Sequence, residues 1–132
     1  MKRLLIDTNI YSLALRGDQG VAEILQKADV VGLSTISIGE LLSGFKGGSR
    51  DAKNREELNM FLDSPRVESY PVDEDTAEYY AEILNNLKES GKPIPTNDIW
   101  IAACAFQHGL KLFSADAHFR SVQGLVLLEP RG

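Results

Sequence analysis

The sequence has one cysteine, no long apolar run and no excess of positive charge. A single cysteine, Cys104, excludes an intrachain disulfide and a zinc site built mainly from cysteines. The longest uninterrupted apolar run, residues 99–106, is far shorter than a membrane span. Asp7 interrupts the apolar start of the chain before it reaches the length of a signal peptide, so we expect a cytoplasmic protein.

The balance of charge is acidic. Fourteen basic and 19 acidic residues give a net charge of −5, which does not suit a protein that coats duplex DNA. Nucleic acid is not excluded as a substrate, because divalent cations bound to an acidic cluster would cancel much of this charge. The length of 132 residues and the ordinary content of apolar and charged residues predict one globular domain spanning residues 1–132.

Short apolar runs alternate with helical patterns along the chain. The runs are brief and flanked by glycines, which favours strands at residues 3–6, 30–33, 67–72, 110–113 and 125–128. Pro71 places the third of these at an edge. Apolar residues at helical spacing predict helices around residues 38–45, 58–62, 77–87 and 98–108. This alternation predicts an α/β fold with a mainly parallel five-stranded sheet and helices on both faces.

Acidic residues stand where such a sheet would bind a ligand, beyond the carboxyl ends of its strands. Asp7 follows the first strand, and Asp116 follows the fourth. Asp98 lies in the first turn of the apolar helix, which we expect Thr96 or Asn97 to cap. Each acid alone also fits a structural role as a helix cap or turn residue.

Glu40 is the least obvious candidate. It lies on the helix face opposite the apolar stripe, beside Ser43 and Gly44, where a solvated surface glutamate is the alternative. Together with Asp7, Asp98 and Asp116 it would place four carboxylates at one sheet edge. Such carboxylates repel one another unless divalent cations are bound, and oxygen ligands suit Mg²⁺, with Mn²⁺ as the second possibility. The chemistry that fits is metal-assisted attack of water on a phosphodiester.

Four motifs, in order and spacing, resemble those of the PIN-domain ribonucleases, and among them the VapC toxins of type II toxin–antitoxin systems. They are Leu5-Ile6-Asp7-Thr8-Asn9, Ser34-Thr35 with Glu40-Leu41-x-x-Gly44, Thr96-Asn97-Asp98-x-x-Ile101-Ala102-Ala103, and Leu112-Phe113-Ser114-x-Asp116-x-x-Phe119. The resemblance covers essentially the whole chain. It implies an α/β/α sandwich and an endoribonuclease that leaves a 5′-phosphate and a 3′-hydroxyl. It also implies a homodimer and a VapB-like antitoxin as partner. Ser114 stands where the family often has threonine, and it keeps the hydroxyl.

The resemblance carries the family's acidic quartet over to Asp7, Glu40, Asp98 and Asp116. We expect Asp7, Asp98 and Asp116 to bind Mg²⁺, and Glu40 either to hold a metal-bound water or to act as general base. Three hydrogen-bonding residues, Thr8, Asn9 and Ser114, are expected to contact the carboxylates or the scissile phosphate.

Several other features have two interpretations. The basic stretch at residues 46–55 is either an RNA-contacting loop or a solvated one. His108 and His118 lack partners at ligand spacing, which favours surface or packing roles, although His118 is near enough to Asp116 to touch substrate. Large apolar side chains on helices favour contacts with a partner; they are Phe61, Tyr79, Tyr80 and Trp100.

Two rival functions are weaker. A phosphatase of the haloacid dehalogenase type needs a second aspartate two residues after the first, where this chain has Asn9. A non-enzymatic, receiver-like acidic binding domain needs paired acids at the end of the first strand, where Asp7 stands alone. Metal-dependent cleavage of RNA by the purified protein would separate the nuclease from both.

Overall fold

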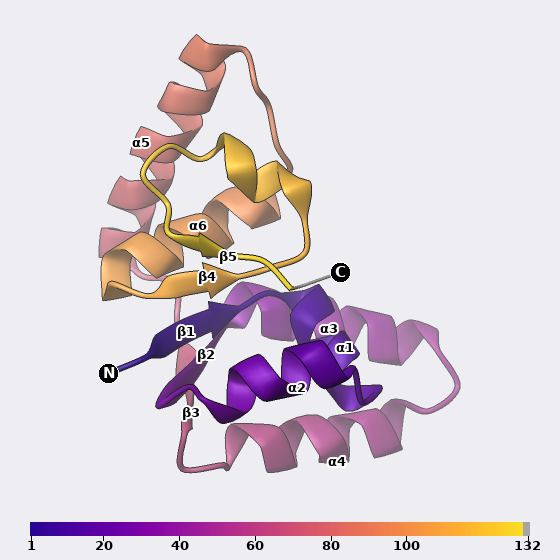
Figure 1. The fold of residues 1–132 in the computed structure, drawn as a ribbon. Coiled ribbons are helices and arrows are strands. Elements are labelled where there is room, and N and C mark those ends of the chain that lie inside the picture. Colours follow the sequence, from indigo (N-terminus) through magenta and orange to yellow (C-terminus); the bar gives the residue numbers. More distant parts are fainter. Residues whose placement is uncertain (131–132) are drawn as a thin grey trace.

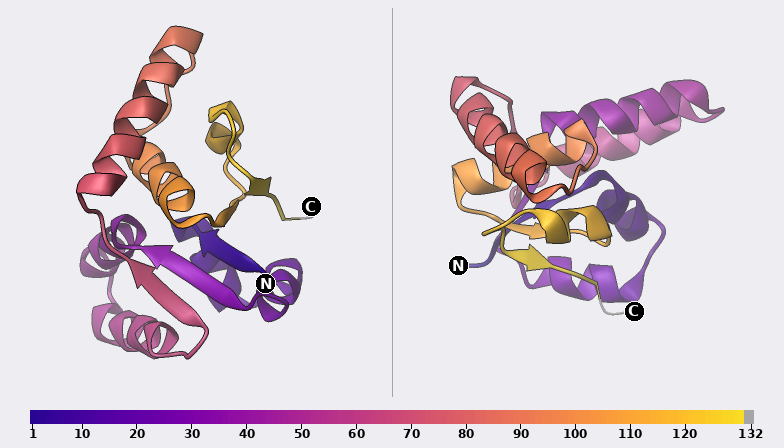
Figure 2. Two further views of the ribbon diagram at one scale, coloured as in Figure 1. Left: turned by 90° about the vertical axis from the view of Figure 1, so that its left-hand side faces the viewer. Right: turned by 90° about the horizontal axis from the view of Figure 1, so that it is seen from above.

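The computed structural model describes residues 1–130, which form a sheet of five strands covered by helices on both faces (Figures 1 and 2). The strands are β1 (Arg3–Ile6), β2 (Val30–Ser34), β3 (Val67–Tyr70), β4 (Lys111–Phe113) and β5 (Leu127–Leu128). Their order is β3-β2-β1-β4-β5, and every neighbouring pair is parallel. The predicted α/β class, the five strands and the edge position of β3 are confirmed.

Seven helical segments surround the sheet. They are α1 (Thr8–Leu15), α2 (Gln19–Gln26), α3 (Thr35–Gly47), α4 (Asp51–Leu62), α5 (Glu74–Ser90), α6 (Thr96–His108) and the 3₁₀ segment η1 (Ala117–Ser121). Helices α5 and α6 lie on one face of the sheet, and α1, α2 and α4 lie on the other (Figure 1). The four predicted helices are present, whereas α1 and α2 were not predicted. Each has only eight residues, and an aspartate side chain caps each N-terminus.

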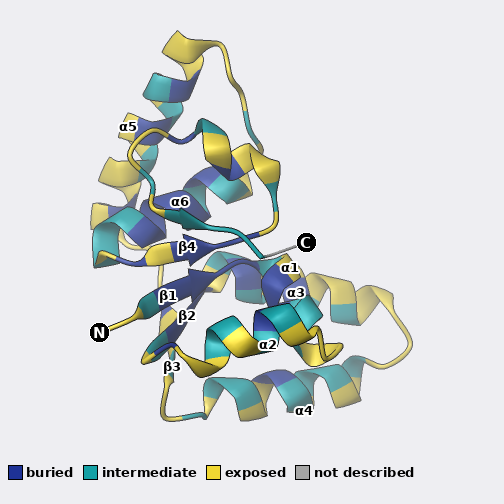
Figure 3. Ribbon diagram, in the orientation of Figure 1, coloured by how far each residue is buried: buried dark blue, intermediate teal, exposed yellow. Residues whose placement is uncertain are grey.

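The sheet divides the core into two apolar layers. Along β1, Leu4 and Ile6 face one layer while Leu5 faces the other, as the period of two in a strand requires. All three are at most 2% exposed. Figure 3 shows this buried centre, with exposed residues gathered on the outer helices and at the turn between α3 and α4. Because β1 is buried on both faces, it is the rigid centre on which the neighbouring strands align.

The strand order has one reversal, and it lies beside β1. The chain runs outward from β1 through β2 to β3, then returns across α5 and α6 to place β4 on the other side of β1. In open parallel sheets this is the point where a crevice forms beyond the carboxyl ends of the strands. Residues that directly follow β1 and β4 therefore meet there.

The basic stretch at residues 46–55 is not a loop. Residues 46–47 end α3 and residues 51–55 begin α4, so only residues 48–50 connect the two helices. Figure 1 shows that the α3–α4 hairpin projects beyond the sheet edge at which the strands end. The glycines that suggested a loop lie at the end of α3 and in this short turn. Within residues 1–130, no helix is long and apolar enough to cross a membrane.

Position 32 in β2 requires glycine because the ring of Tyr70 lies close to the backbone there. A Cβ atom built at this position would lie 2.5 Å from Cε2 of Tyr70, whose ring lies over the strand from β3. The ring cannot easily move away, because Tyr70 is only 6% exposed and packs against the imidazole of His108 at 4.4 Å between ring centroids.

We expect Gly32→Ala to lower the free energy of unfolding by about 1–3 kcal/mol, the usual cost of overpacking a core. Gly44→Ala in α3 is the matched control, because its Cβ would have no neighbour within 4 Å and alanine is the better helix former. Urea unfolding followed by circular dichroism measures both. Equal stability of the two variants would show that the Tyr70 ring adapts at no cost.

Candidate active site

Asp7 lies at the junction of β1, α1 and β4. Its side chain is the N-cap of α1, because Oδ1 accepts a hydrogen bond from the backbone N–H of Ile10 at 2.9 Å. Oδ2 accepts a hydrogen bond from the hydroxyl of Ser114, which directly follows β4. The Ser114 hydroxyl also accepts the backbone N–H of Asp116 at 2.9 Å. Asp7 is therefore a helix N-cap, as one interpretation expected, and it also lines the cleft with the other acids.

Asp7 is 5% exposed. Burial raises its pKa above the usual value for an aspartate, and the nearby carboxylates of Asp116 and Glu40 raise the pKa further. The hydrogen bonds from Ser114 and Ile10 oppose this shift. An ionised Asp7 is thus held in a place that disfavours its negative charge.

Asp98 lies in the first turn of α6, as predicted, and its carboxylate is 17% exposed. Burial raises the pKa of Asp98, and the charge of Asp116 raises it further, while His118 opposes the shift. The predicted cap of this helix is wrong. Pro95 occupies the cap position without a side-chain hydrogen bond, and Thr96 is already the first helical residue.

Glu40 reaches the site from α3. Its Oε1 accepts a hydrogen bond from the Thr8 hydroxyl at 2.6 Å, and its Oε2 accepts one from the Asn97 side-chain amide at 3.3 Å. These bonds join α3 to the starts of α1 and α6, so an exposed carboxylate has a fixed orientation. Glu40 is an exposed surface residue, as the alternative interpretation expected, but its carboxylate is engaged by these two hydrogen bonds and it lines the cleft.

Asp116 and His118 complete the acidic group. Asp116 caps η1, because its Oδ1 accepts the backbone N–H of His118 at 2.8 Å. The imidazole Nδ1 of His118 then lies 3.0 Å from Asp116 Oδ1 and 3.2 Å from Asp98 Oδ2. The expectation that His118 lacks partners is wrong. A histidine two residues after an acid at a strand end was the available signal, but the contact with Asp98 depends on the tertiary fold.

These side chains line one cleft of about 410 Å³. Its lining residues are Asp7, Thr8, Asn9, Glu40, Pro95, Thr96, Asn97, Asp98, Ile101, Asp116 and His118. The structure thus brings together all four predicted acids with Thr8 and Asn9, while Ser114 lies fully buried behind Asp7. Within the described chain, no lysine or arginine lines the cleft.

The donor set fits a divalent cation. Carboxylates from four different elements face one space, and two of them have pKa values raised partly by their neighbours' charge. Asp98, Asp116 and His118 each offer one ligand atom, and these atoms lie within 4.8 Å of one another. A bound dication would relieve the repulsion that this arrangement creates.

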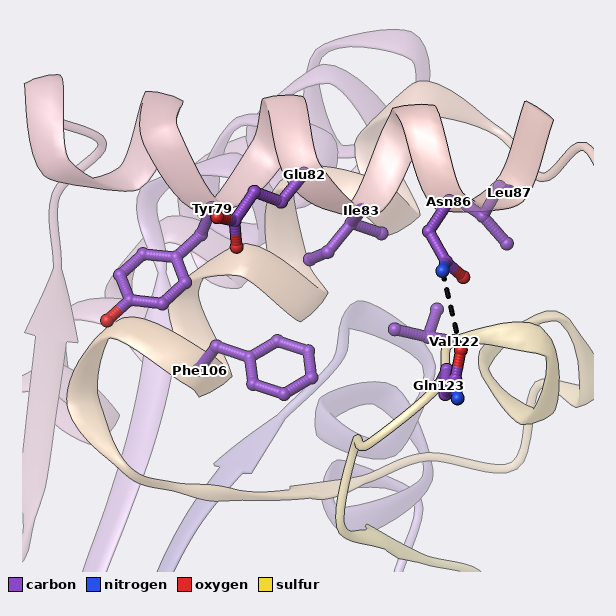
Figure 4. Close-up of a pocket in the computed structure, with 8 residues that line it drawn as sticks. All are labelled: Tyr79, Glu82, Ile83, Asn86, Leu87, Phe106, Val122 and Gln123. Atoms are coloured by element: carbon purple, nitrogen blue, oxygen red, sulfur yellow. Dashed lines mark hydrogen bonds between the residues drawn. The ribbon is translucent and has the colours of Figure 1, made fainter. Parts of the chain in front are cut away.

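A second hollow, of about 260 Å³, is mainly apolar and lies between α5, the end of α6 and residues 122–123 (Figure 4). The rings of Tyr79 and Phe106 are nearly parallel, with centroids 6.5 Å apart, and Figure 4 shows them beside each other. The side-chain amide of Asn86 donates to Gln123 across the far end at 3.3 Å. Its single carboxylate, that of Glu82, lacks the paired acids that the first cleft offers.

Comparisons with known proteins show the family of this chain. A family profile described as PIN domain matches residues 4–125. Ribonuclease VapC5 of Mycobacterium tuberculosis is 27% identical over 94% of this chain and 90% of its own length. Ribonuclease VapC2 of Haemophilus influenzae is 30% identical over 86% of both chains.

Solved structures give the same result. The crystal structure of VapBC2 from Rickettsia felis, bound to a DNA fragment from their promoter, contains a chain with 25% identity and a TM-score of 0.86. The match covers 97% of this chain and 98% of that one. With the family profile spanning most of the sequence, the chain belongs to the PIN-domain family and, within it, to the VapC group.

Proposed function

We propose that this protein is a metal-dependent endoribonuclease and the toxin of a type II toxin–antitoxin pair. The observation that carries the proposal is the convergence of Asp7, Glu40, Asp98 and Asp116 in one cleft without lysine or arginine. Relatives named as ribonucleases match nearly the whole chain, which supports the same reaction class. An RNA-cleaving toxin meets its substrate in the cytoplasm, where we place this protein.

Three carboxylates, those of Asp7, Asp98 and Asp116, would hold a divalent cation. When bound, the cation supplies positive charge that stabilises the developing charge on the phosphate and favours ionisation of a water ligand. Ser114 fixes the Asp7 carboxylate through its hydroxyl. Asp98 is fixed by its place in the first turn of α6.

Glu40 is the group that we assign to the attacking water. Its two oxygens are held by Thr8 and Asn97, so the carboxylate points in a set direction and stays accessible. It orients the water or accepts its proton as the oxygen attacks phosphorus. The bond between phosphorus and the 3′ oxygen breaks, and the departing oxygen takes a proton from solvent water, which leaves a 5′-phosphate and a 3′-hydroxyl.

The rest of the surface supports an RNA substrate. The α3–α4 hairpin, which projects beyond the edge of the sheet where the cleft lies, carries Lys46, Arg50 and Lys53 (Figure 1). Such side chains contact phosphates irrespective of sequence. The phosphatase alternative loses support because the residue two positions after Asp7 that lines the cleft is Asn9 and not an aspartate. The receiver-like alternative loses support because Asp7 is not accompanied by a second acid at the end of β1.

We also propose a VapB-like antitoxin and a second copy of this chain as partners. The Rickettsia felis relative was solved in a VapBC2 complex. Exposed apolar side chains, including Met60 at 69% and Tyr79 at 37%, and the hollow in Figure 4 support protein contacts. Of the other predicted contact residues, Tyr80 stacks on Trp100 and Phe61 packs against Tyr11, so their rings are partly used within the chain.

The first prediction concerns activity. Asp98→Asn should lower kcat/KM for RNA cleavage by about 100-fold or more, because it removes a charged cation ligand, worth several kcal/mol in the transition state. Excess EDTA should abolish wild-type cleavage, and adding back a divalent cation should restore it. Glu23→Gln, an exposed acid on α2, is the control with unchanged activity. Full cleavage in EDTA by homogeneous protein would refute the metal mechanism.

The second prediction concerns stability. The folded protein raises the pKa of Asp7, so ionisation costs more in the folded state than in the unfolded state. This cost is fully present above the folded pKa and absent below the unfolded value near 3.8. Asp7→Asn should therefore melt at the same or a higher temperature than wild type in EDTA at pH 7, while its activity is lost.

The asparagine oxygen still accepts the Ile10 N–H, so the α1 cap is kept, and its amide nitrogen can donate to the Ser114 hydroxyl oxygen in place of the bond that Ser114 gives Asp7. Any gain in melting temperature should shrink as the pH is lowered towards 4. Calorimetry between pH 4 and 7 checks both the sign and the trend. A clear loss of stability at pH 7 would show that the Asp7 carboxylate acts mainly as a structural cap.

The third prediction concerns assembly. The purified chain should have twice the mass of one chain by light scattering, because a domain this small leaves large apolar side chains uncovered. A VapB-like protein encoded beside it should bind and suppress RNA cleavage. A single-chain mass at every accessible concentration would contradict the homodimer and leave the nuclease proposal intact.

A further inference from the structure

His118 is the one cleft residue that brings a nitrogen ligand to the acidic group. Its Nδ1 lies 3.0 Å from Asp116 Oδ1 and 3.2 Å from Asp98 Oδ2. One ligand atom from each of the three residues fits within 4.8 Å. The imidazole therefore points at the same space as the carboxylates, although its side chain is half exposed.

The backbone holds His118 in this place from both sides. Its own N–H donates to Asp116 Oδ1 at 2.8 Å, which anchors the start of η1. The next residue, Phe119, is 1% exposed and is packed in the core that α5 and α6 cover. The turn between these anchors fixes the Cα of His118 beside the cleft.

The identity of the donor atom affects which cation binds. Mg²⁺ takes oxygen ligands and keeps several waters, whereas imidazole nitrogen is a better ligand for first-row transition metals. Mn²⁺ accepts oxygen ligands and also binds nitrogen, so a mixed set of two carboxylates and one imidazole discriminates between the two ions. A neutral imidazole leaves the negative charge of the cluster unchanged, so the demand for a dication persists.

We infer that His118 binds the active-site cation through Nδ1 and makes this site select Mn²⁺ over Mg²⁺. The inference rests on the proposed function in requiring that the acidic cleft bind a catalytic cation. It adds a ligand beyond the acidic quartet, and it assigns a metal preference that the carboxylates alone would not give. In the bound form the imidazole proton resides on Nε2.

The composition of the chain makes a direct test possible. There are only two histidines, and the other, His108, packs against Tyr70 away from the cleft. Electron spin-echo spectroscopy of bound Mn²⁺ detects a directly ligated ¹⁴N nucleus without any RNA present. We expect imidazole ¹⁴N modulation in wild type and in His108→Gln, and its loss in His118→Gln.

Affinities supply the second readout. The protein is titrated with Mn²⁺, and free Mn²⁺ is measured by its electron paramagnetic resonance signal in solution. Repeating the titration with Mg²⁺ as competitor gives the ratio of the Mg²⁺ dissociation constant to the Mn²⁺ dissociation constant. This ratio should fall about tenfold or more in His118→Gln, which is the lower end of the loss of metal affinity seen when residues around a metal site are mutated. It should stay unchanged in His108→Gln. Circular dichroism confirms that both variants are folded.

The outcomes separate the inference from the proposed function. Wild-type protein that binds Mn²⁺ and cleaves RNA but shows no ¹⁴N coupling would overturn the inference alone. Parallel loss of affinity for both ions in His118→Gln, with the ratio unchanged, would also overturn it, since His118 would then only position Asp98 and Asp116. Wild-type protein that binds neither ion would refute the metal site itself.

Discussion

The fold and the site both depend on the environment of the Asp7 carboxylate. One oxygen caps α1 and the other accepts the Ser114 hydroxyl, so a single side chain fixes the ends of β1 and β4 relative to each other. The same Ser114 hydroxyl accepts the Asp116 N–H, which sets the start of η1 and, through it, the position of His118. These bonds add to the backbone pairing of β1 with β4, in which Ile6 lies opposite Phe113. The acidic cleft is therefore held in part by the same bonds that lie at the ends of β1 and β4.

Like charge is the constraint that these bonds oppose. The four carboxylates come from the residue that follows β1, from α3, from α6 and from the segment after β4, so no local turn brings them together. They converge because three parallel strands end at one edge and because Thr8 and Asn97 direct Glu40 towards it. Burial and mutual repulsion raise the pKa of Asp7 and of Asp98, which means that the ionised cluster is maintained at a cost in folding free energy.

The features that could be predicted from the sequence are those that follow from apolar patterns and from position at the end of a strand. Short apolar runs flanked by glycines located all five strands, and helical spacing of apolar residues located four helices. Three of the acids were found because they follow a strand or open a buried helix. Sequence patterns did not predict the features that depend on tertiary contacts. Pro95 rather than Thr96 or Asn97 occupies the α6 cap, and Thr96 and Asn97 instead line the cleft from the first turn of the helix. His118, in η1, contacts Asp98 across 20 residues of sequence, so spacing alone gave no reason to pair them.

The repulsion among the ionised carboxylates links cation binding to folding. The converged site exists only in the folded chain, so a cation that binds it stabilises the folded state by mass action. At a cation concentration 100 times the dissociation constant, this stabilisation is about 2.7 kcal/mol. The repulsion that weakens the metal-free protein is the same interaction that strengthens cation binding, because binding removes it. A cluster that is poor for stability is therefore good for affinity, and the buried centre of the sheet around β1 is what allows the protein to tolerate it.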